Sequence, residues 1–389
     1  MKIGLVLSAT PSYSETFFNS KIKGLQENDF EVVLFVQHKS PSFKLCPVYK
    51  SPKVFKNPML QFFSMLVVFL KLVPNSKTII RYMRLERRDN NSWFQIVKKI
   101  YLNAHILSQK LNWLHFGFAT MALGKENVAK SIDAKMGVSF RGFDLAIYPL
   151  KHPNCYNLLW KRLDKVHTIS NDLLNIAYSL GLSKNMNVEK ITPAIDIEFF
   201  KNEDKNIKPN QHKLQILTVG RLHWKKGIVA TLEALAKLKD ENIDFTYSIV
   251  GMGEDYERIA YAIVDLKLTN HVKLFGKKSR NELIQIYKKS DIYIQYSISE
   301  GFCNSVIEAQ AMGPLCIVSN AEGLTENIEN NKTGWLVNSL EAPTLALKII
   351  EVLNLNEQEK EMIRSNARER VLNYFSLEKQ KEAFKSFYS

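Results

Sequence analysis

The sequence predicts an α/β protein of two domains, each with a Rossmann-like alternation of strands and helices. Its 389 residues are sufficient for two hydrophobic cores. Residues 2–36 alternate strand, loop, helix and strand, and a second series of strands begins at residues 214–219. Between them, residues 201–213 are polar and lack periodicity, which is typical of an interdomain linker.

The first strand–helix–strand unit opens the chain. Lys2 to Ser8 predicts a buried strand, residues from about Phe17 to Glu27 a helix, and Glu31 to Val36 the next strand. No Gly-x-Gly-x-x-Gly follows the first strand, so the sequence does not predict a dinucleotide site here. Further strands are expected at residues 136–140, 166–170, 245–250, 272–276 and 315–319.

Residues 44–110 form a basic and partly apolar segment. They contain 13 basic and two acidic residues, whereas residues 201–389 contain 26 basic and 25 acidic residues and are almost neutral. Arg81, Arg84 and Arg88 have the spacing of one helical face. Two interpretations stay open: a solvated surface, or contact with an anionic partner.

If the partner is anionic, the segment favours a membrane surface over nucleic acid. No nucleic-acid recognition module is recognisable, and clustered basic residues beside an apolar run are typical of an interfacial element. The longest apolar run, about Met59 to Val73, is interrupted by polar residues. It falls short of the 18 or so apolar residues of a membrane span, so we expect peripheral contact. Four scattered cysteines without a Cys-x-x-Cys pair predict reduced thiols in a cytosol.

The stretch from Gln295 to Met312 carries the strongest functional pattern. An alternating strand is followed by a turn with Glu300, and then by a helix that Asn304 can cap and that carries Glu308. A helix start favours phosphate, and carboxylates beside it can accept hydrogen bonds from sugar hydroxyls. The pattern therefore indicates a nucleotide-diphosphate sugar, although on spacing alone both glutamates could be solvated surface residues.

Residues 299–313, Ser-Glu-Gly-Phe-Cys-Asn-Ser-Val-Ile-Glu-Ala-Gln-Ala-Met-Gly, resemble the Glu-x7-Glu signature of the retaining GT-B glycosyltransferases of family 4. The resemblance covers most of residues 214–338 and extends more weakly into the N-terminal half. It implies two Rossmann-like domains facing an interdomain cleft. The expected domains are residues 1–205, with a C-terminal helix at 376–389 crossing back onto them, and residues 206–375.

The resemblance also implies roles for individual residues of the second domain. Glu300 would accept from donor-sugar hydroxyls and Glu308 from the ribose, while Arg221 and Lys226 would neutralise the diphosphate. We find no Asp-x-Asp after a strand, so we expect no metal and no cofactor besides the donor. The remaining candidates for donor contact are Gly220, Gly253, Phe302, Cys303, Asn304 and Ser305.

The first domain supplies the other candidates. Arg141-Gly-Phe-Asp144 resembles the family's His-Gly-Tyr/Phe-Asp motif, with Arg141 in the place of histidine. Arg141 could alter donor contacts in an active enzyme, contact acceptor phosphate, or mark impaired catalysis. His115 could replace part of the lost function or be a packed structural residue. Ser14 and Asp144 are further cleft candidates.

Together these features predict a retaining glycosyltransferase that moves a hexose-type sugar from a nucleotide-diphosphate sugar to a lipid-linked or cell-envelope glycan. We expect a cytoplasmic protein at the inner face of the plasma membrane, contacting anionic lipid through residues 44–110. Two alternatives remain: a non-catalytic GT-B subunit that binds sugar nucleotides or a partner protein, and a GT-B nucleotide-sugar epimerase.

Overall fold

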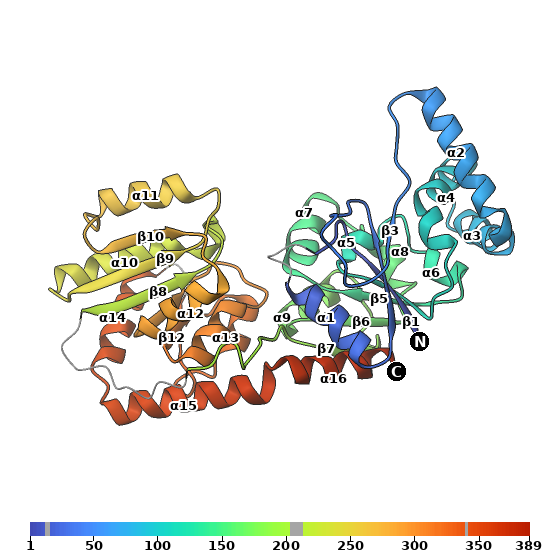
Figure 1. The fold of residues 1–389 in the computed structure, drawn as a ribbon. Coiled ribbons are helices and arrows are strands. Elements are labelled where there is room, and N and C mark those ends of the chain that lie inside the picture. The colour runs from blue at the N-terminus through green and yellow to red at the C-terminus, as the bar shows by residue number, and fades with distance from the viewer. Residues whose placement is uncertain (12–15, 203–212, 339–340) are drawn as a thin grey trace. The chain divides into compact units, whose positions relative to one another are not determined.

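The computed structural model describes residues 1–11, 16–202, 213–338 and 341–389. The chain forms two compact units (Figure 1). The first contains Met1–Ile191 and Lys381–Ser389, and the second contains Thr192–Gln380. Each described unit is an α/β structure built on one parallel sheet, as the sequence predicts.

The first unit is built on a seven-stranded sheet in the order β3-β2-β1-β4-β5-β6-β7. Its strands are β1 (Lys2–Val6), β2 (Glu31–Val36), β3 (Val48–Lys50), β4 (Trp113–Phe116), β5 (Lys135–Ser139), β6 (Lys165–Thr168) and β7 (Val188–Lys190). The helices are α1 (Thr16–Glu27), α2 (Pro58–Leu72), α3 (Ser76–Arg88), α4 (Trp93–Leu107), α5 (Ala119–Ala122), α6 (Val128–Ser131), α7 (Tyr148–Lys151), α8 (Asn157–Trp160) and α9 (Asn171–Ser179), with a 3-10 turn η2 (Val73–Asn75) and a π-helical turn η3 (Phe143–Ile147).

The second unit is built on a six-stranded sheet in the order β10-β9-β8-β11-β12-β13. Its strands are β8 (Leu214–Val219), β9 (Phe245–Val250), β10 (Val272–Gly276), β11 (Ile292–Gln295), β12 (Leu315–Ser319) and β13 (Trp335–Val337). The helices are α10 (Ile228–Asp240), α11 (Tyr256–Asp265), α12 (Arg280–Lys289), α13 (Asn304–Met312), α14 (Ala342–Leu353) and α15 (Glu357–Tyr374), with 3-10 turns η4 (Trp224–Lys226) and η5 (Glu322–Asn327). The last helix, α16 (Leu377–Tyr388), continues into the first unit.

The central strands of both sheets are buried on both faces, which is why they are almost continuous apolar runs. β11 is an example, since all four of its residues are buried. In the first unit, the C-terminal helix covers part of the sheet. Phe384, Phe387 and Tyr388 join the core that includes Trp113, and the Trp113 indole N–H donates to the Tyr388 carbonyl at 3.1 Å. The expected packing of this helix on the first domain is confirmed.

The two units divide at Ile191/Thr192 and at Gln380/Lys381, whereas the sequence placed the divisions near residues 205 and 376. The backbone of Ile195 explains the difference, because its N–H donates to the Phe375 carbonyl at 2.9 Å. The side chain of Gln380 donates to the Thr192 carbonyl at 2.8 Å. These bonds tie the stretch after Ile191 to the end of α15 and the start of α16.

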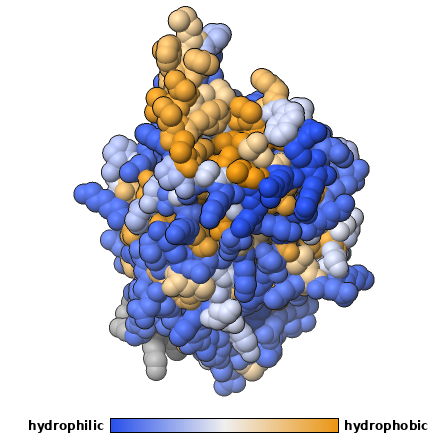
Figure 2. Space-filling view, turned by 90° about the vertical axis from the view of Figure 1, so that its right-hand side faces the viewer, coloured by the Kyte–Doolittle hydropathy of each residue, from blue (hydrophilic) through white to orange (hydrophobic). Residues whose placement is uncertain are grey.

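Helix α2 is apolar and largely exposed. Met59 is 70% exposed, Phe62 65% and Leu70 63%. The apolar side chains gather in a projection at the top of the face shown in Figure 2. The helical run Pro58–Arg88 has 31 residues, and its best 18-residue window has a mean hydropathy of 1.4 with 6% of the window buried.

By length and composition alone, that run could cross a membrane, which the sequence analysis did not anticipate. The prediction considered only the run from about Met59 to Val73, whereas the structure joins it to α3 through one 3-10 turn. The second half of the run differs in character, because Arg81, Arg84, Arg87 and Arg88 all lie on α3 and are exposed.

Candidate functional site

The loop after β8 places Lys226 against the end of β11. Gly227, at the start of α10, has φ +60°, and a Cβ there would lie 1.9 Å from the Tyr296 carbonyl oxygen. Only glycine permits this approach without distortion. The Ile298 N–H donates to the Lys225 carbonyl at 2.7 Å, which fixes the same contact from the other side. The two loops that carry Lys226 and Glu300 are thereby held together.

Lys226 and Glu300 form an ion pair in which the ammonium donates to Oε2 of the carboxylate. Their side chains are 18% and 19% exposed, so the pair is only partly screened by water. Burial alone would lower the pKa of Lys226, but Glu300 outweighs that effect and raises it above its usual value. Arg221 is exposed, and its positive charge lowers the pKa of Lys226. The two cations are therefore close enough to interact electrostatically.

Gly251 and Gly253, in the turn after β9, pack against the loop that carries Arg221. A Cβ at Gly253 would lie 2.0 Å from the carbonyl oxygen of Leu222, and one at Gly251 would lie 1.7 Å from that of Gly220. The turn after β9 therefore packs backbone to backbone against residues 220–222. This contact explains the glycines of the Gly-x-Gly turn by packing, and it gives Gly253 and Gly220 positions beside Arg221.

The start of α13 differs from the sequence prediction in one respect. Cys303, not Asn304, occupies the N-cap position, and no side chain makes a capping hydrogen bond there. Asn304 is the first helical residue, so its predicted capping role is wrong. The side chain of Asn327 instead hydrogen-bonds both backbone groups of Cys303. Its Oδ1 accepts from the Cys303 N–H at 3.1 Å, and its Nδ2 donates to the Cys303 carbonyl at 2.9 Å.

A buried hydroxyl network holds the first turn of α13. The Ser305 hydroxyl donates to the Val219 carbonyl at 2.9 Å, and the Tyr293 hydroxyl lies 2.8 Å from Ser305 Oγ. The Cys303 sulfur lies 3.2 Å from the same oxygen, and burial raises the pKa of its thiol. Ser305 and Cys303 thus anchor the turn between Phe302, which is buried, and the end of β8.

Glu308 lies one turn into α13 and is partly buried. Burial raises the pKa of its carboxyl to about 7, although the Tyr287 hydroxyl, which donates to Oε2 at 3.0 Å, and the charge of Arg280 oppose that rise. A carboxyl with this pKa changes its protonation state near neutral pH. The sequence analysis missed Tyr287, Tyr293 and Asn327, because their roles depend on strands and helices that meet only in the folded unit.

The Arg141–Asp144 turn of the first unit is built around a buried carboxylate. Asp144 Oδ1 accepts from the Arg141 N–H at 2.8 Å and Oδ2 from the Ala119 N–H at 2.7 Å. Burial raises the pKa of Asp144 to about 7, against the effect of these two bonds and of the Arg141 charge. Asp144 is fully buried, so it positions the turn and the start of α5. The Arg141 guanidinium lies 4.1 Å above the Phe17 ring.

His115 is also fully buried, and it belongs to a polar chain inside the first unit. Its Nε2 lies 3.2 Å from the Lys21 ammonium and 2.8 Å from Ser139 Oγ, which lies 2.7 Å from His167 Nδ1. Burial, reinforced by the charge of Lys21, lowers the pKa of His115 well below its usual value. The structure favours the packed interpretation of His115. Ser14 lies outside the described residues.

The second unit therefore brings together Glu300, Lys226 and the start of α13, with Arg221 and Glu308 nearby. Such a site offers cations for phosphate and carboxylates for hydroxyls within one unit. Within the described parts of the chain, no group of three or more His, Cys, Asp or Glu side chains is arranged to hold a metal ion. Cys46, Cys155, Cys303 and Cys316 are free thiols.

Comparison with known proteins bears on this unit directly. Residues 199–370 match the family model described as glycosyl transferases group 1. The match contains every candidate residue of the second unit. It supports the assignment of these loops to a glycosyltransferase domain.

Solved structures extend the likeness to the whole chain. One structure, of Anabaena Alr3699/HepE in complex with UDP, is 16% identical, covers 99% of this chain and 98% of its own, and superposes with a TM-score of 0.74. The fold is GT-B. At this identity the likeness concerns the fold alone, and it places both units in one known architecture.

Curated relatives share part of this chain. A putative colanic acid biosynthesis glycosyltransferase, WcaL, from Salmonella typhimurium is 27% identical over 67% of this chain and 66% of its own length. An Escherichia coli protein named UDP-Gal:alpha-D-GlcNAc-diphosphoundecaprenol alpha-1,3-galactosyltransferase is 27% identical over 53% of each chain. The chain thus spans between about half and two thirds of the length of these two relatives.

Proposed function

We propose that this protein is a retaining glycosyltransferase of the family 4 type, which transfers a hexose-type sugar from a nucleotide-diphosphate sugar to a lipid-linked or cell-envelope glycan. The observation that carries the proposal is the Lys226–Glu300 pair beside the start of α13, inside a stretch that matches glycosyl transferases group 1. The names of the curated relatives support the choice of acceptor.

The proposed chemistry follows from where charge develops. When the glycosidic bond breaks, the leaving nucleotide diphosphate gains negative charge, and fixed cations stabilise that state more than the ground state. Lys226 and Arg221 would supply those cations, each through charge-assisted bonds of about 1.5–3 kcal/mol. They would take the place of a metal ion. The backbone N–H groups of Phe302, Asn304 and Ser305 would add hydrogen bonds to sugar and phosphate, whereas the Cys303 N–H already donates to Asn327.

The Lys226–Glu300 pair prepares both partners for the donor. Each charge is already partly desolvated, so little further desolvation is needed when the pair opens. Lys226 would turn to phosphate and Glu300 to the hydroxyls of the transferred sugar. Glu308 would accept from the ribose. In a retaining mechanism without a protein nucleophile, the donor phosphate would take the acceptor proton on the same face.

For the acceptor side we propose peripheral contact with the inner face of the plasma membrane. Residues 44–110 contain both the exposed apolar face of α2 and the arginines of α3. An apolar face enters the interface between headgroups and acyl chains, and arginines bind anionic headgroups, so the combination fits an anionic bilayer. Arg141 would contact either donor or acceptor phosphate.

The decisive experiment is product analysis with a panel of nucleotide-diphosphate sugars, with and without membrane extract from a bacterial host as the acceptor source. We expect one donor to be consumed only with the extract, and the new linkage to keep the donor's anomeric configuration by NMR. Glu300→Gln should abolish transfer. Glu322→Gln is the matched control, because Glu322 accepts from the neighbouring Ser299 hydroxyl at 2.8 Å and is exposed.

The alternatives give different products. A donor that changes its sugar without extract indicates an epimerase. Donor binding with no turnover under any condition indicates a non-catalytic subunit, and an inverted linkage contradicts the retaining mechanism.

A further inference from the structure

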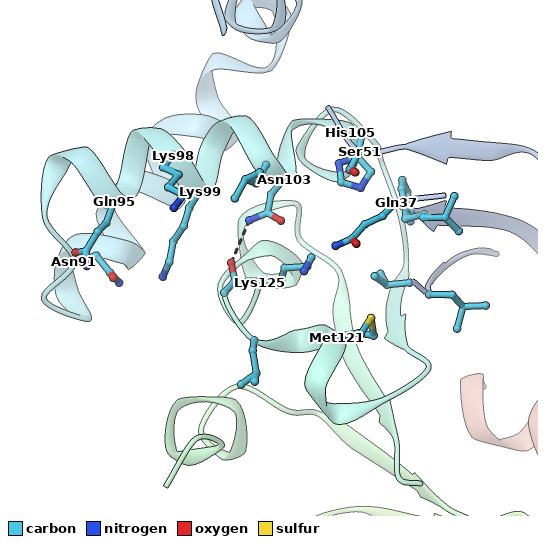
Figure 3. Close-up of a pocket in the computed structure, with 17 residues that line it drawn as sticks. Gln37, Ser51, Asn91, Gln95, Lys98, Lys99, Asn103, His105, Met121 and Lys125 are labelled. Carbon is cyan, nitrogen blue, oxygen red and sulfur yellow. Dashed lines mark hydrogen bonds between the residues drawn. The ribbon is translucent and has the colours of Figure 1, made fainter. Parts of the chain in front are cut away.

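The first unit contains a cavity whose lining residues all belong to that unit (Figure 3). It has a volume of about 370 Å³, is partly open, and is lined by the ends of β1 and β2, by α4 and by residues 121–125. Val6, Phe35 and Leu102 are among the apolar residues of its wall, while amides and lysines supply the polar part. Gln37, Asn103 and Lys125 come from three separate segments and point toward one another.

The charge of the cavity wall is entirely positive. Lys98, Lys99 and Lys125 line it, and none of the 17 described lining residues is Asp or Glu. Lys99 is already paired, because its ammonium lies 2.7 Å from the Glu86 carboxylate. Within the described residues, Lys98 and Lys125 form no such ion pair. The cavity therefore carries two lysine charges that can attract an anion.

Burial destabilises the charged form of Lys125 and lowers its pKa, whereas the charge of Glu126 raises it. His105 adds no charge at neutral pH, because burial lowers the pKa of its ring to about 4. An anion at Lys125 would offset the cost of holding that ammonium in a partly dry wall.

Asn103 adds a second, independent indication of a ligand. Its Nδ2 donates to the Gly124 carbonyl at 3.1 Å, which fixes the orientation of the amide. Asn103 is only 2% exposed, and its Oδ1 is buried without a hydrogen-bond partner among the described residues. A buried acceptor of this kind needs a donor such as a hydroxyl. The cavity is thus complementary to a ligand that carries both an anionic group and a hydroxyl.

The cavity is connected to α2 through α4, although no residue of α2 is among its described lining residues. Helix α4, which supplies much of its wall, packs against α2. The Ser64 hydroxyl of α2 lies 2.7 Å from the Tyr101 hydroxyl of α4, so the two helices are joined by side-chain contact as well. A ligand with a polar head in the cavity would need a hydrocarbon part long enough to pass α4 before it reached the exposed apolar side chains of α2.

We infer that this cavity binds the sugar-phosphate headgroup of a lipid-anchored acceptor. Lys125 and Lys98 bind the phosphate oxygens, Asn103 Oδ1 accepts from a sugar hydroxyl, and the hydrocarbon chain runs along α2. The identification of the ligand as the acceptor rests on the proposed function, whereas the binding of a sugar phosphate does not.

The test is calorimetric titration of the full chain with glucose 1-phosphate, inorganic diphosphate and farnesyl diphosphate. We expect Lys125→Gln to weaken the binding of all three at least tenfold. Asn103→Leu should weaken glucose 1-phosphate at least fivefold and leave inorganic diphosphate unchanged. Lys130→Gln is the matched control, because Lys130 is an exposed lysine on the adjacent α6. It should bind like the wild type.

A lipid source is separated from a free sugar phosphate by α2. Farnesyl diphosphate should bind at least tenfold more tightly than inorganic diphosphate, and Phe62→Glu should remove that advantage. Equal binding of the two diphosphates contradicts the lipid part of the inference. Absence of binding by the wild type, or binding that Lys125→Gln leaves unchanged, overturns the site and leaves the cavity to water.

The same variants keep this inference separate from the proposed function. Lys125→Gln should retain the wild-type affinity for the donor nucleotide, which binds to the second unit, and this also shows that the variant is folded. If the wild type binds glucose 1-phosphate, Lys125→Gln weakens that binding, and no donor is turned over, the cavity stands and the transferase proposal fails. If donor is transferred and Lys125→Gln transfers it at the wild-type rate and affinity for acceptor, only the cavity inference fails.

Discussion

The cations of the two units are placed in opposite ways. In the second unit, Lys226 is 18% exposed and paired with Glu300 between two loops that glycines hold in contact. In the first unit, the arginines of α3 are exposed beside the apolar face of α2. A paired and partly buried charge can act only on a ligand of defined geometry. Exposed charges act together on any anionic surface, and salt weakens them. We therefore propose that the Lys226–Glu300 pair serves donor recognition and that the α2–α3 surface serves attachment to a membrane.

Lys226→Ala should produce the largest effect. Under the proposed mechanism it removes the cation that faces developing charge, and it leaves the Glu300 carboxylate without its partner, so we expect kcat for transfer to fall by about 10²–10³. Lys225→Ala, in the same 3-10 turn, should retain kcat within about twofold, since a partly exposed side chain outside the pair makes no such contact. Steady-state kinetics measures both. Equal losses in the two variants would remove the distinction between paired and unpaired cations.

The attachment surface can be tested with a matched pair of double variants. Phe62→Glu with Val67→Glu places two charges on the exposed face of α2, and we expect binding to anionic vesicles to fall about tenfold or more. Tyr261→Glu with Val264→Glu makes the same change on α11, where the side chains are somewhat more exposed, and should not affect binding. Vesicle sedimentation measures both, and melting temperatures verify folding. Comparable losses in both variants would mean that attachment is not specific to α2.

Glu308 should give the recognition site a pH dependence. Its pKa of about 7 means that the ionised fraction rises from about a tenth at pH 6 to about nine tenths at pH 8. If the ionised carboxylate accepts from ribose, affinity for a nucleotide-diphosphate sugar should rise by up to about tenfold over that interval. The Glu308→Gln variant should show a flat profile in calorimetry. A flat wild-type profile would assign Glu308 to structure.

The same carboxyl has a defined effect on stability. Because its pKa in the folded chain lies above its usual 4.5, folding favours the protonated form. The free energy of unfolding contributed by Glu308 therefore decreases as pH rises from about 4.5 to 7. Urea titrations at several pH values should show that decrease in the wild type and a smaller one in Glu308→Gln.

Asn304→Ala should have the smallest effect. Because Cys303 holds the N-cap position, the Asn304 side chain makes no cap, and its removal should change the free energy of unfolding by less than about 0.5 kcal/mol. Ser279→Ala is the control, since Ser279 caps α12 with a capping box, and we expect a cost of about 1 kcal/mol. A larger loss of unfolding free energy for Asn304→Ala than for Ser279→Ala would mean that Asn304 does cap α13. Fewer backbone N–H groups would then be available to a ligand.

Much of the fold and of the donor site could be predicted from sequence because it depends on local patterns. The buried strands are largely apolar runs, such as β12, whose five residues are all buried, and α13 ends at Gly313, whose φ of +107° is one that glycine readily adopts. The spacing from Glu300 to Glu308 and the apolar stripe of α16 are visible in the same way. These features need no knowledge of what lies across the sheet.

Contacts between distant segments could be decided only by the tertiary structure. Asn327, not Asn304, fixes the start of α13, and His115 is enclosed by Lys21 and Ser139. The cavity beside Asn103 arises where two strand ends, α4 and a loop fail to fill the space between them. Burial, pairing and the loss of water around a charge are properties of assembled surfaces, whereas strand and helix periodicity is a property of neighbours along the chain.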